Sequence, residues 1–310
     1  MDNLFNIRLT NIGIIIFGGN VNFNLKEAIL IFIRGVLMGS ADIVPGVSGG
    51  TIALITGIYA HLVEAISKIK FGFIKPLFKG DFKGFKNQLF DEIDFKFFIP
   101  LVLGIGVAFL TLAKVVTYCM DAYTAWTYSF FLGLILASAV ILFKKIDKIN
   151  AKHFLFAVIG AILTYIFVSL NPIAANHSLP VLFISGMIAI CAMILPGISG
   201  SFLLLLLGQY EYMLNALHQL NFTEIIVFVI GAVIGILGFS RILNYLLKNY
   251  EEFTMAFLIG VMLGSLKVPS VEIINSVNLN FAGLFPCLIV AVIGFGLIII
   301  LETRFNYIEE

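Results

Sequence analysis

The feature that most constrains this chain is a series of apolar segments that fills most of its length. Several of them approach the ~20 residues that a helix needs to cross a bilayer. Charged residues make up 12% of the sequence, about half of the ~25% typical of soluble domains. The segments lie at residues 26–44, 51–66, 97–118, 124–143, 152–170, 179–195, 201–217, 224–247, 252–266 and 281–301. We therefore predict an all-α polytopic membrane protein.

A glycine-rich loop occurs twice, each time between two apolar segments. Residues 45–51 read PGVSGGT and residues 196–202 read PGISGSF. The surrounding residues also match, first at an offset of 151, then of 127, and finally as AVIG at 157–160 and 291–294. Matched pairs include Phe32 and Phe183, Gly35 and Gly186, Gly57 and Gly208, Tyr59 and Tyr210, Gly104 and Gly231, Lys114 and Arg241, and Gly133 and Gly260. Such internal similarity predicts two repeats, each a broken helix pair followed by three helices.

The charge distribution predicts how these repeats cross the membrane. With the N-terminus in the cytoplasm, 15 of the 19 Lys and Arg residues fall on the cytoplasmic side, as the positive-inside rule requires. Each half makes three full crossings, an odd number, so the second repeat is inverted relative to the first. Ten full crossings would preserve this parity, but the short segments after each loop favour re-entrant hairpins. Both termini are then cytoplasmic.

The predicted organisation follows from these crossings. The parts are an N-terminal cytoplasmic or interfacial arm (1–25), repeat 1 (26–170, with a hairpin at 26–66, a lysine-rich cytoplasmic loop at 67–96 and helices at 97–170), repeat 2 (178–303, with a hairpin at 179–217 and helices at 224–301) and a cytoplasmic tail (304–310).

The two loops are the candidate functional site. Proline lacks an N–H donor and glycine accepts positive φ, so each loop ends one helix and begins another. Irregular backbone at membrane depth must be buried in protein or line a cavity. Ser48 or Thr51, and Ser199 or Ser201, are candidate N-caps, and the helix ends behind them would favour an anion at the midplane. The alternative is that the glycines only allow close helix packing.

The sequence around the loops resembles a known family. RGVLMGSADIVPGVSGGT at 34–51 and ILPGISGS at 194–201 are similar to the PopT-type polyprenyl-phosphate transporters, once a bacterial domain family of unknown function. The resemblance covers residues 26–303. It implies return of undecaprenyl phosphate from the outer to the inner leaflet of the cytoplasmic membrane, and it marks the two loops, Arg34 and Asp42 as functional.

The second loop departs from the first, which argues against strictly symmetric binding. Ser185 stands in place of Arg34, Met193 in place of Asp42, and Ser201–Phe202 in place of Gly50–Thr51.

Four charged residues in or near the spans have alternative roles. Arg34 either contacts the headgroup or extends to the interface. Lys114 and Arg241 occupy matched positions, where they either relay an anion between the faces or lie at the interfaces. Asp42 caps or pairs with Arg34, or it takes part in proton coupling, because a carboxylate repels a phosphate unless it is protonated.

The predicted headgroup site gathers both loops and three of these charges. It comprises Arg34, Pro45, Gly46, Ser48, Gly49, Gly50, Thr51, Lys114, Pro196, Gly197, Ser199, Gly200, Ser201 and Arg241, with Asp42 as the coupling or ion-pair residue.

Other functions are less consistent with the sequence. A lipid phosphatase would need a nucleophile such as His, and no His lies beside either loop. We predict no enzyme activity, no cofactor, no metal site and no nucleic-acid partner; the partners are a polyprenyl phosphate and the bilayer, and the sequence does not fix an oligomeric state. The alternative function is a transporter or channel for a small anion or carboxylate.

Overall fold

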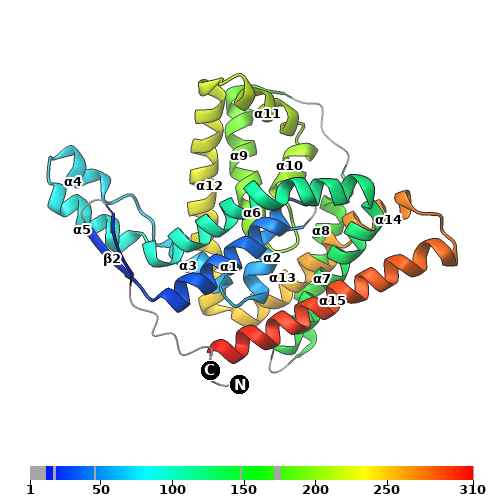
Figure 1. Ribbon diagram of the computed structural model, residues 1–310. Helices are drawn as coiled ribbons and strands as arrows, with labels where there is room; N and C mark the ends of the chain where they lie inside the picture. Colours follow the sequence, from blue (N-terminus) through cyan, green and yellow to red (C-terminus); the bar gives the residue numbers. More distant parts are fainter. Residues whose placement is uncertain (1–11, 17–18, 45–46, 147–148, 171–175, 310) are drawn as a thin grey trace.

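The computed structural model describes residues 12–16, 19–44, 47–146, 149–170 and 176–309, and it places the side chains of the described residues from 24 to 303. Pro45 and Gly46 of the predicted site lie outside the described residues. Figure 1 shows a helical protein in which two upright helices rise from a layer of inclined ones.

Within the described residues, five helical segments are long and apolar enough to cross a membrane. They are α6 (Phe95–Ala122), α7 (Thr124–Lys144), α12 (Phe222–Asn249), the segment Glu251–Ser276 formed by α13 (Glu251–Ser265) and α14 (Lys267–Ser276), and Phe281–Thr303 within α15 (Phe281–Glu309). The number rises to six if α2 (Gly49–Ile55) and α3 (Tyr59–Ser67), which are bent by 116°, count as one broken span or re-entrant loop. The chain is therefore a multi-pass membrane protein.

The remaining apolar helices belong to the two hairpins, except for α8 (Ala151–Phe167). They are α1 (Leu25–Asp42), α8, α9 (Leu179–Ile194), α10 (Gly200–Leu206) and α11 (Tyr210–His218). Helix bounds recur at the offsets seen in the sequence: α2 and α3 have the lengths of α10 and α11, 151 residues apart, and α6 has the length of α12, 127 residues apart.

The helix after each loop is shorter than the sequence suggested. We expected single helices over 51–66 and 201–217, but α2 and α10 stop after seven residues each. The chain turns at Gly57 and Gly208, whose φ values of 79° and 66° lie in the left-handed region, where glycine carries no Cβ penalty. Because a helix dipole is the sum of its aligned peptides, these short helices provide a weaker field than we expected.

Pairs of helices interlock the two halves. Helix α1 packs along α6, and α9 along α12, whereas α7 packs against α15 and α8 against α13. The first two pairs lie within a half, and the last two join the halves. Small residues permit the close approach: a Cβ added at Gly133 of α7 would clash with the backbone of Ala291, as is common where membrane helices pack.

The most buried side chains gather around the first loop. Val44, Ala53, Val63, Ile135 and Met262 are at most 1% exposed, and they come from the first loop, α2, α3, α7 and α13. The first hairpin therefore sits inside the protein, while many side chains of α6, α8, α12 and α15 face outward.

Two regions outside the bundle contain small elements. The predicted arm holds an antiparallel pair of strands, β1 (Ile12–Ile16) and β2 (Gly19–Phe23), so the all-α expectation is wrong there; β-branched isoleucines favour the extended backbone. The lysine-rich loop contains α4 (Ile74–Phe78) and α5 (Phe82–Glu92), which project from the bundle beside the strands (Figure 1).

Candidate functional site

The two glycine-rich loops contact each other. The Ser48 hydroxyl donates to the carbonyl of Leu195 at 3.0 Å, and the N–H of Gly197 donates to the Thr51 hydroxyl at 2.9 Å. Ser48 and Thr51 are 1% and 2% exposed. Each loop thus satisfies polar groups of the other, which is how irregular backbone is tolerated at membrane depth.

Close approach at this junction depends on small residues. A Cβ at Gly50 would lie 2.6 Å from the carbonyl oxygen of Ile194, and a Cβ at Gly197 would lie 2.8 Å from Cα of Met262. Gly197 also has a φ of 85°, in the region that side chains rarely adopt. Pro196 is fully buried beside it.

The start of α2 is capped from within the protein. The N–H of Gly49 donates to Oδ1 of Asp42 at 2.6 Å, and the N–H of Gly50 donates to the Ser48 hydroxyl at 3.1 Å. Asp42, for which we had considered a cap, an ion pair or proton coupling, therefore acts as a cap of α2 in this structure. The N–H groups of Gly49 and Gly50 at the start of α2 are therefore occupied, and a carboxylate already holds the position of an anion there.

The start of α10 differs in the residue that covers it. Met193, 151 residues after Asp42, lies against Gly200, since a Cβ on that glycine would be 2.5 Å from Cγ of Met193. Ser199 does not cap α10 with its side chain; its hydroxyl lies 2.8 Å from that of Ser201. The second loop therefore offers hydroxyls and an apolar cover where the first has a carboxylate.

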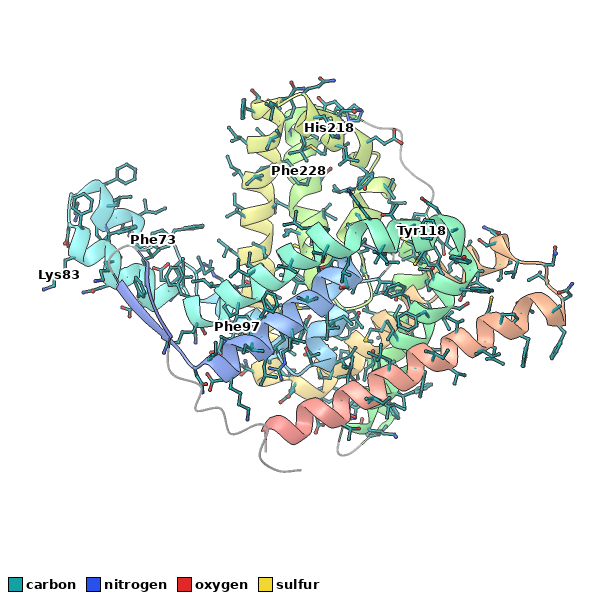
Figure 2. All side chains as sticks on the ribbon, in the orientation of Figure 1. Phe73, Lys83, Phe97, Tyr118, His218 and Phe228 are labelled. Atoms are coloured by element: carbon teal, nitrogen blue, oxygen red, sulfur yellow. The ribbon has the colours of Figure 1, made fainter. Side chains whose placement is uncertain are left out.

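A cavity of about 480 Å³ reaches this second loop, and we call it the loop cavity. Asp42, Ser199, Ser201 and Tyr210 supply its polar groups. Its walls are mainly apolar and come from α6, α9, α10 and α12, with Phe109, Ile190, Leu204 and Phe228 among the lining residues; Figure 2 labels Phe228 on α12. A polar end within apolar walls suits an amphipathic guest.

Arg34 lines a different cavity. Its side chain is 7% exposed and borders a space of about 400 Å³ together with Glu27, His61, Asp94 and Lys96, which we call the Arg34 cavity. The loop cavity and the Arg34 cavity share no lining residue. The structure thus separates Arg34 from Ser199 and Ser201, with which we had grouped it.

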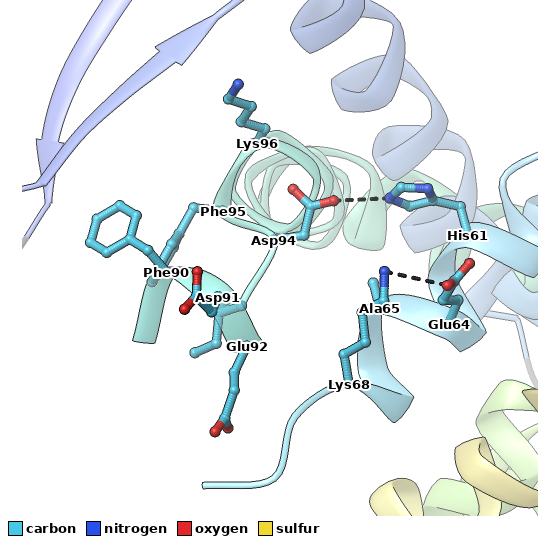
Figure 3. A pocket seen from close by; sticks show the side chains of 11 residues that line it. His61, Glu64, Ala65, Lys68, Phe90, Asp91, Glu92, Asp94, Phe95 and Lys96 are labelled. Atoms are coloured by element: carbon cyan, nitrogen blue, oxygen red, sulfur yellow. Dashed lines mark hydrogen bonds and ion pairs between the residues drawn. The ribbon is translucent and has the colours of Figure 1, made fainter. Parts of the chain in front are cut away.

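His61 is a residue whose surroundings the sequence did not reveal. His61 Nε2 lies 3.1 Å from Oδ2 of Asp94, and its ring packs at 4.4 Å from that of Phe97. Figure 3 shows His61 and Asp94 pointing toward each other from α3 and the start of α6. Asp94 also caps α6 through the N–H of Phe97; this polar residue directly before an apolar helix was the available signal.

Lys114 and Arg241 line neither of these two cavities. Lys114 is exposed on α6. Arg241 donates from Nη2 to the carbonyl of Ile69 at 2.9 Å. Further along the same helix, α12, Lys248 Nζ lies 2.9 Å from Oε1 of Glu64. Arg241 therefore joins α12 to the end of α3 in this structure.

The matched surfaces of the two halves are packed differently. Helix α3 packs along α12, but α11 does not pack along α6 in a comparable way, although both of those helices are described throughout. The loop cavity occupies the space between α6 and the second hairpin. The protein is thus closed where α3 meets α12 and open where α11 would meet α6.

Comparison with known proteins gives one family and two relatives. The family described as undecaprenyl phosphate translocase-like matches residues 38–280. A polyprenyl-phosphate transporter from Vibrio cholerae is 42% identical over 235 residues, which cover 76% of this chain and 75% of the relative. A polyprenyl-phosphate transporter from Staphylococcus aureus is 31% identical over 281 residues, covering 85% and 92% respectively. No solved structure matches.

Proposed function

This chain belongs to the undecaprenyl phosphate translocase-like family, a family of transporters and not of enzymes, and we propose that it returns undecaprenyl phosphate from the outer to the inner leaflet of the bacterial cytoplasmic membrane. The family match agrees with the resemblance predicted from the sequence. The loop cavity is the observation that carries the proposal for the site, because it joins a polar end to apolar walls in the interior of a membrane protein.

The chemistry of the cavity suits such a lipid. A charged group at the centre of a bilayer costs at least about 2.5–3.5 kcal/mol on insertion scales, so the phosphate needs polar partners on its way across. The hydroxyls of Ser199 and Ser201 can donate to it. The apolar walls then face the first isoprenoid units, while the rest of the tail stays in lipid.

Asp42 gives the site a route to proton coupling. It lines the loop cavity and caps Gly49, so an arriving phosphate meets a carboxylate. Two negative charges in a site of low dielectric repel each other unless one of them binds a proton. We expect a proton on Asp42 to accompany passage of the headgroup.

The unequal packing of the two halves supports alternating access. In an inverted repeat, the end of α3 and the end of α11 lie at opposite faces of the membrane. With α3 cytoplasmic, as the positive-inside pattern favours, the α3–α12 contact closes the cytoplasmic side and the loop cavity opens toward the outer side. If α3 moved away from α12 and α11 packed along α6 instead, the headgroup site would open toward the inner leaflet.

Reconstitution tests this function. Proteoliposomes containing fluorescent undecaprenyl phosphate should show transfer of the label between leaflets without release of inorganic phosphate. The double variant Ser199→Ala, Ser201→Ala should be about tenfold slower, as expected for lost hydrogen bonds to a charged group. Ser276→Ala, at an exposed hydroxyl of α14, is the matched control and should retain the wild-type rate.

The alternative function gives the opposite result. A chloride or carboxylate flux in the same vesicles, with no movement of the lipid, would identify a small-anion transporter and reject the lipid proposal.

A further inference from the structure

The Arg34 cavity gathers basic side chains from three helices. Arg34 comes from α1, His61 from α3 and Lys96 from the first turn of α6, and all three border the same space of about 400 Å³. A buried guanidinium beside an exposed lysine places charge both deep in the cavity and at its edge. Arginine and lysine in such a position are the usual ligands of phosphate groups.

The two acids of this cavity each accept from a neighbouring group, which for Asp94 includes His61 of the same cavity. Asp94 accepts from the N–H of Phe97 and pairs with His61, and Glu27 accepts from the side-chain amide of Asn24 at 3.2 Å. Both acids thus have donors within their own surroundings. The charged groups lining the cavity are Glu27, Arg34, His61, Asp94 and Lys96.

Comparison with the other half shows that fold maintenance does not require this charge. At the matched positions Ser185 replaces Arg34, Tyr212 replaces His61, Asn221 replaces Asp94 and Thr223 replaces Lys96. Helices α9 and α12 nevertheless pack as α1 and α6 do. The α9–α12 pair thus forms with neutral residues at these positions, so the packing of α1 along α6 does not require Arg34 or Lys96 to be charged.

The cavity lies one short helix away from the junction of the loops. Ser48 begins α2 at the junction, and Gly57 and Ile58, which line the Arg34 cavity, follow its end. Seven residues at about 1.5 Å each make α2 about 10 Å long. A headgroup leaving the junction toward α3 would therefore reach Arg34 within a short distance.

We propose that the Arg34 cavity is a second headgroup site, which binds the phosphate monoester of the lipid on the cytoplasmic side before release. The direction of lipid transport in this inference rests on the proposed function. The phosphate ligand is inferred from the residues that line the cavity itself. Arg34 and Lys96 hold the phosphate oxygens, and His61 adds a donor from the first turn of α3. The absence of an equivalent site in the second half makes the two ends of the path chemically different.

Binding of farnesyl phosphate to the purified full-length protein in detergent tests the site. Isothermal titration should detect two sites in the wild type. Lys96→Gln should weaken one of them at least about tenfold, the effect of one lost charge-assisted hydrogen bond, and His61→Gln should weaken the same site. Lys83→Gln, on α5 away from the cavity (Figure 2), should bind as the wild type does.

The outcomes separate this inference from the proposed function. Unchanged stoichiometry and affinity in both Lys96→Gln and His61→Gln would overturn the second site, whatever the proteoliposomes show. Loss of one site in these variants would support it even if reconstituted protein moved no lipid. Lys96 is exposed, so Lys96→Gln keeps the test valid should His61→Gln fold poorly. A second experiment titrates inorganic phosphate alone. If inorganic phosphate binds as tightly as farnesyl phosphate does, the cavity is a free-phosphate site, which contradicts a lipid site.

Discussion

The two hairpins of this protein have matching helices but unequal surroundings. Helix α3 of the first hairpin packs along α12 and is held there by Arg241 and Lys248. Helix α11 of the second has the same length and the same preceding glycine turn, yet it leaves α6 uncovered and a cavity beside the second loop. This unequal packing of equal elements supports our proposal that the protein alternates between two arrangements, of which the structure holds one.

The loops differ in chemistry as well as in packing. Asp42 fills the start of α2 with a carboxylate, while Met193 covers the start of α10 with an apolar side chain. The second loop therefore meets the loop cavity with hydroxyls and an apolar side chain, and Asp42 of the first half lines the same cavity. Under the proposed function, the second half captures the headgroup, and the first half contains the charged Arg34 cavity.

The largest effect is expected from breaking the junction that both halves share. Gly197→Val places a β-branched residue at a φ of 85° and a Cβ near the backbone of Met262, at a cost of about 2–5 kcal/mol. We expect little folded protein in the membrane and no transport. Thermal unfolding in detergent and lipid transfer measure this. Gly238→Val, where a Cβ meets nothing within 4 Å, is the control; equal stability of the two variants would contradict the tight junction.

A second change would make the loops alike. Met193→Asp should place a carboxylate beside Gly200, as Asp42 lies beside Gly49, and so fill the proposed phosphate position. We expect transport to fall about ten- to a hundredfold, the cost of competing with a charge-assisted hydrogen bond. Lipid transfer in proteoliposomes measures the loss, with Met193→Leu as the size-matched control. Wild-type transport by Met193→Asp would show that the headgroup does not approach this loop.

Removing the contacts that Arg241 and Lys248 make between α12 and α3 should have a smaller effect. Glu64 and Lys248 are partly exposed, and such pairs contribute about 0–1 kcal/mol. The double variant Arg241→Ala, Lys248→Ala should therefore increase the population of the arrangement in which α3 is apart from α12, by about two- to fivefold. Distances between spin labels on α3 and α12 report this shift. A population equal to that of the wild type would show that these contacts have no role in it.

The matched residues predict the contact of the opposite arrangement. Lys114 corresponds to Arg241 at an offset of 127, and Leu220 to Ile69 at an offset of 151. Lys114 should therefore approach the carbonyl of Leu220 when α11 closes on α6. Lys114→Ala should shift the population by a similar small factor in the opposite sense, measured with labels on α6 and α11. A shift in the same direction as the Arg241 variant would contradict the exchange.

Some of this organisation could be predicted from the sequence because it depends on local chemistry. Proline and glycine within apolar segments fixed the positions of both loops, and the matched offsets anticipated helices of equal length. Glycine also marked the turns at Gly57 and Gly208, but a lone glycine within an apolar run is compatible with a continuous helix, so these breaks were missed.

Other features depend on tertiary contacts that spacing along the chain does not encode. Asp42 and Arg34 lie eight residues apart on α1, which favoured a shared site, yet they border different cavities. Which hairpin packs closely was also beyond prediction, because matched sequences support both arrangements. The β1–β2 pair was missed since a short isoleucine-rich run reads equally well as part of an apolar helix.

A cryo-EM map of the protein in lipid nanodiscs with undecaprenyl phosphate tests the central claim most directly. With α11 apart from α6, the account predicts headgroup density in the loop cavity, beside Ser199 and Ser201, with the tail leaving between α6 and the second hairpin. Headgroup density held at the outer surface of the bundle, with the loop cavity closed by side chains, would contradict it.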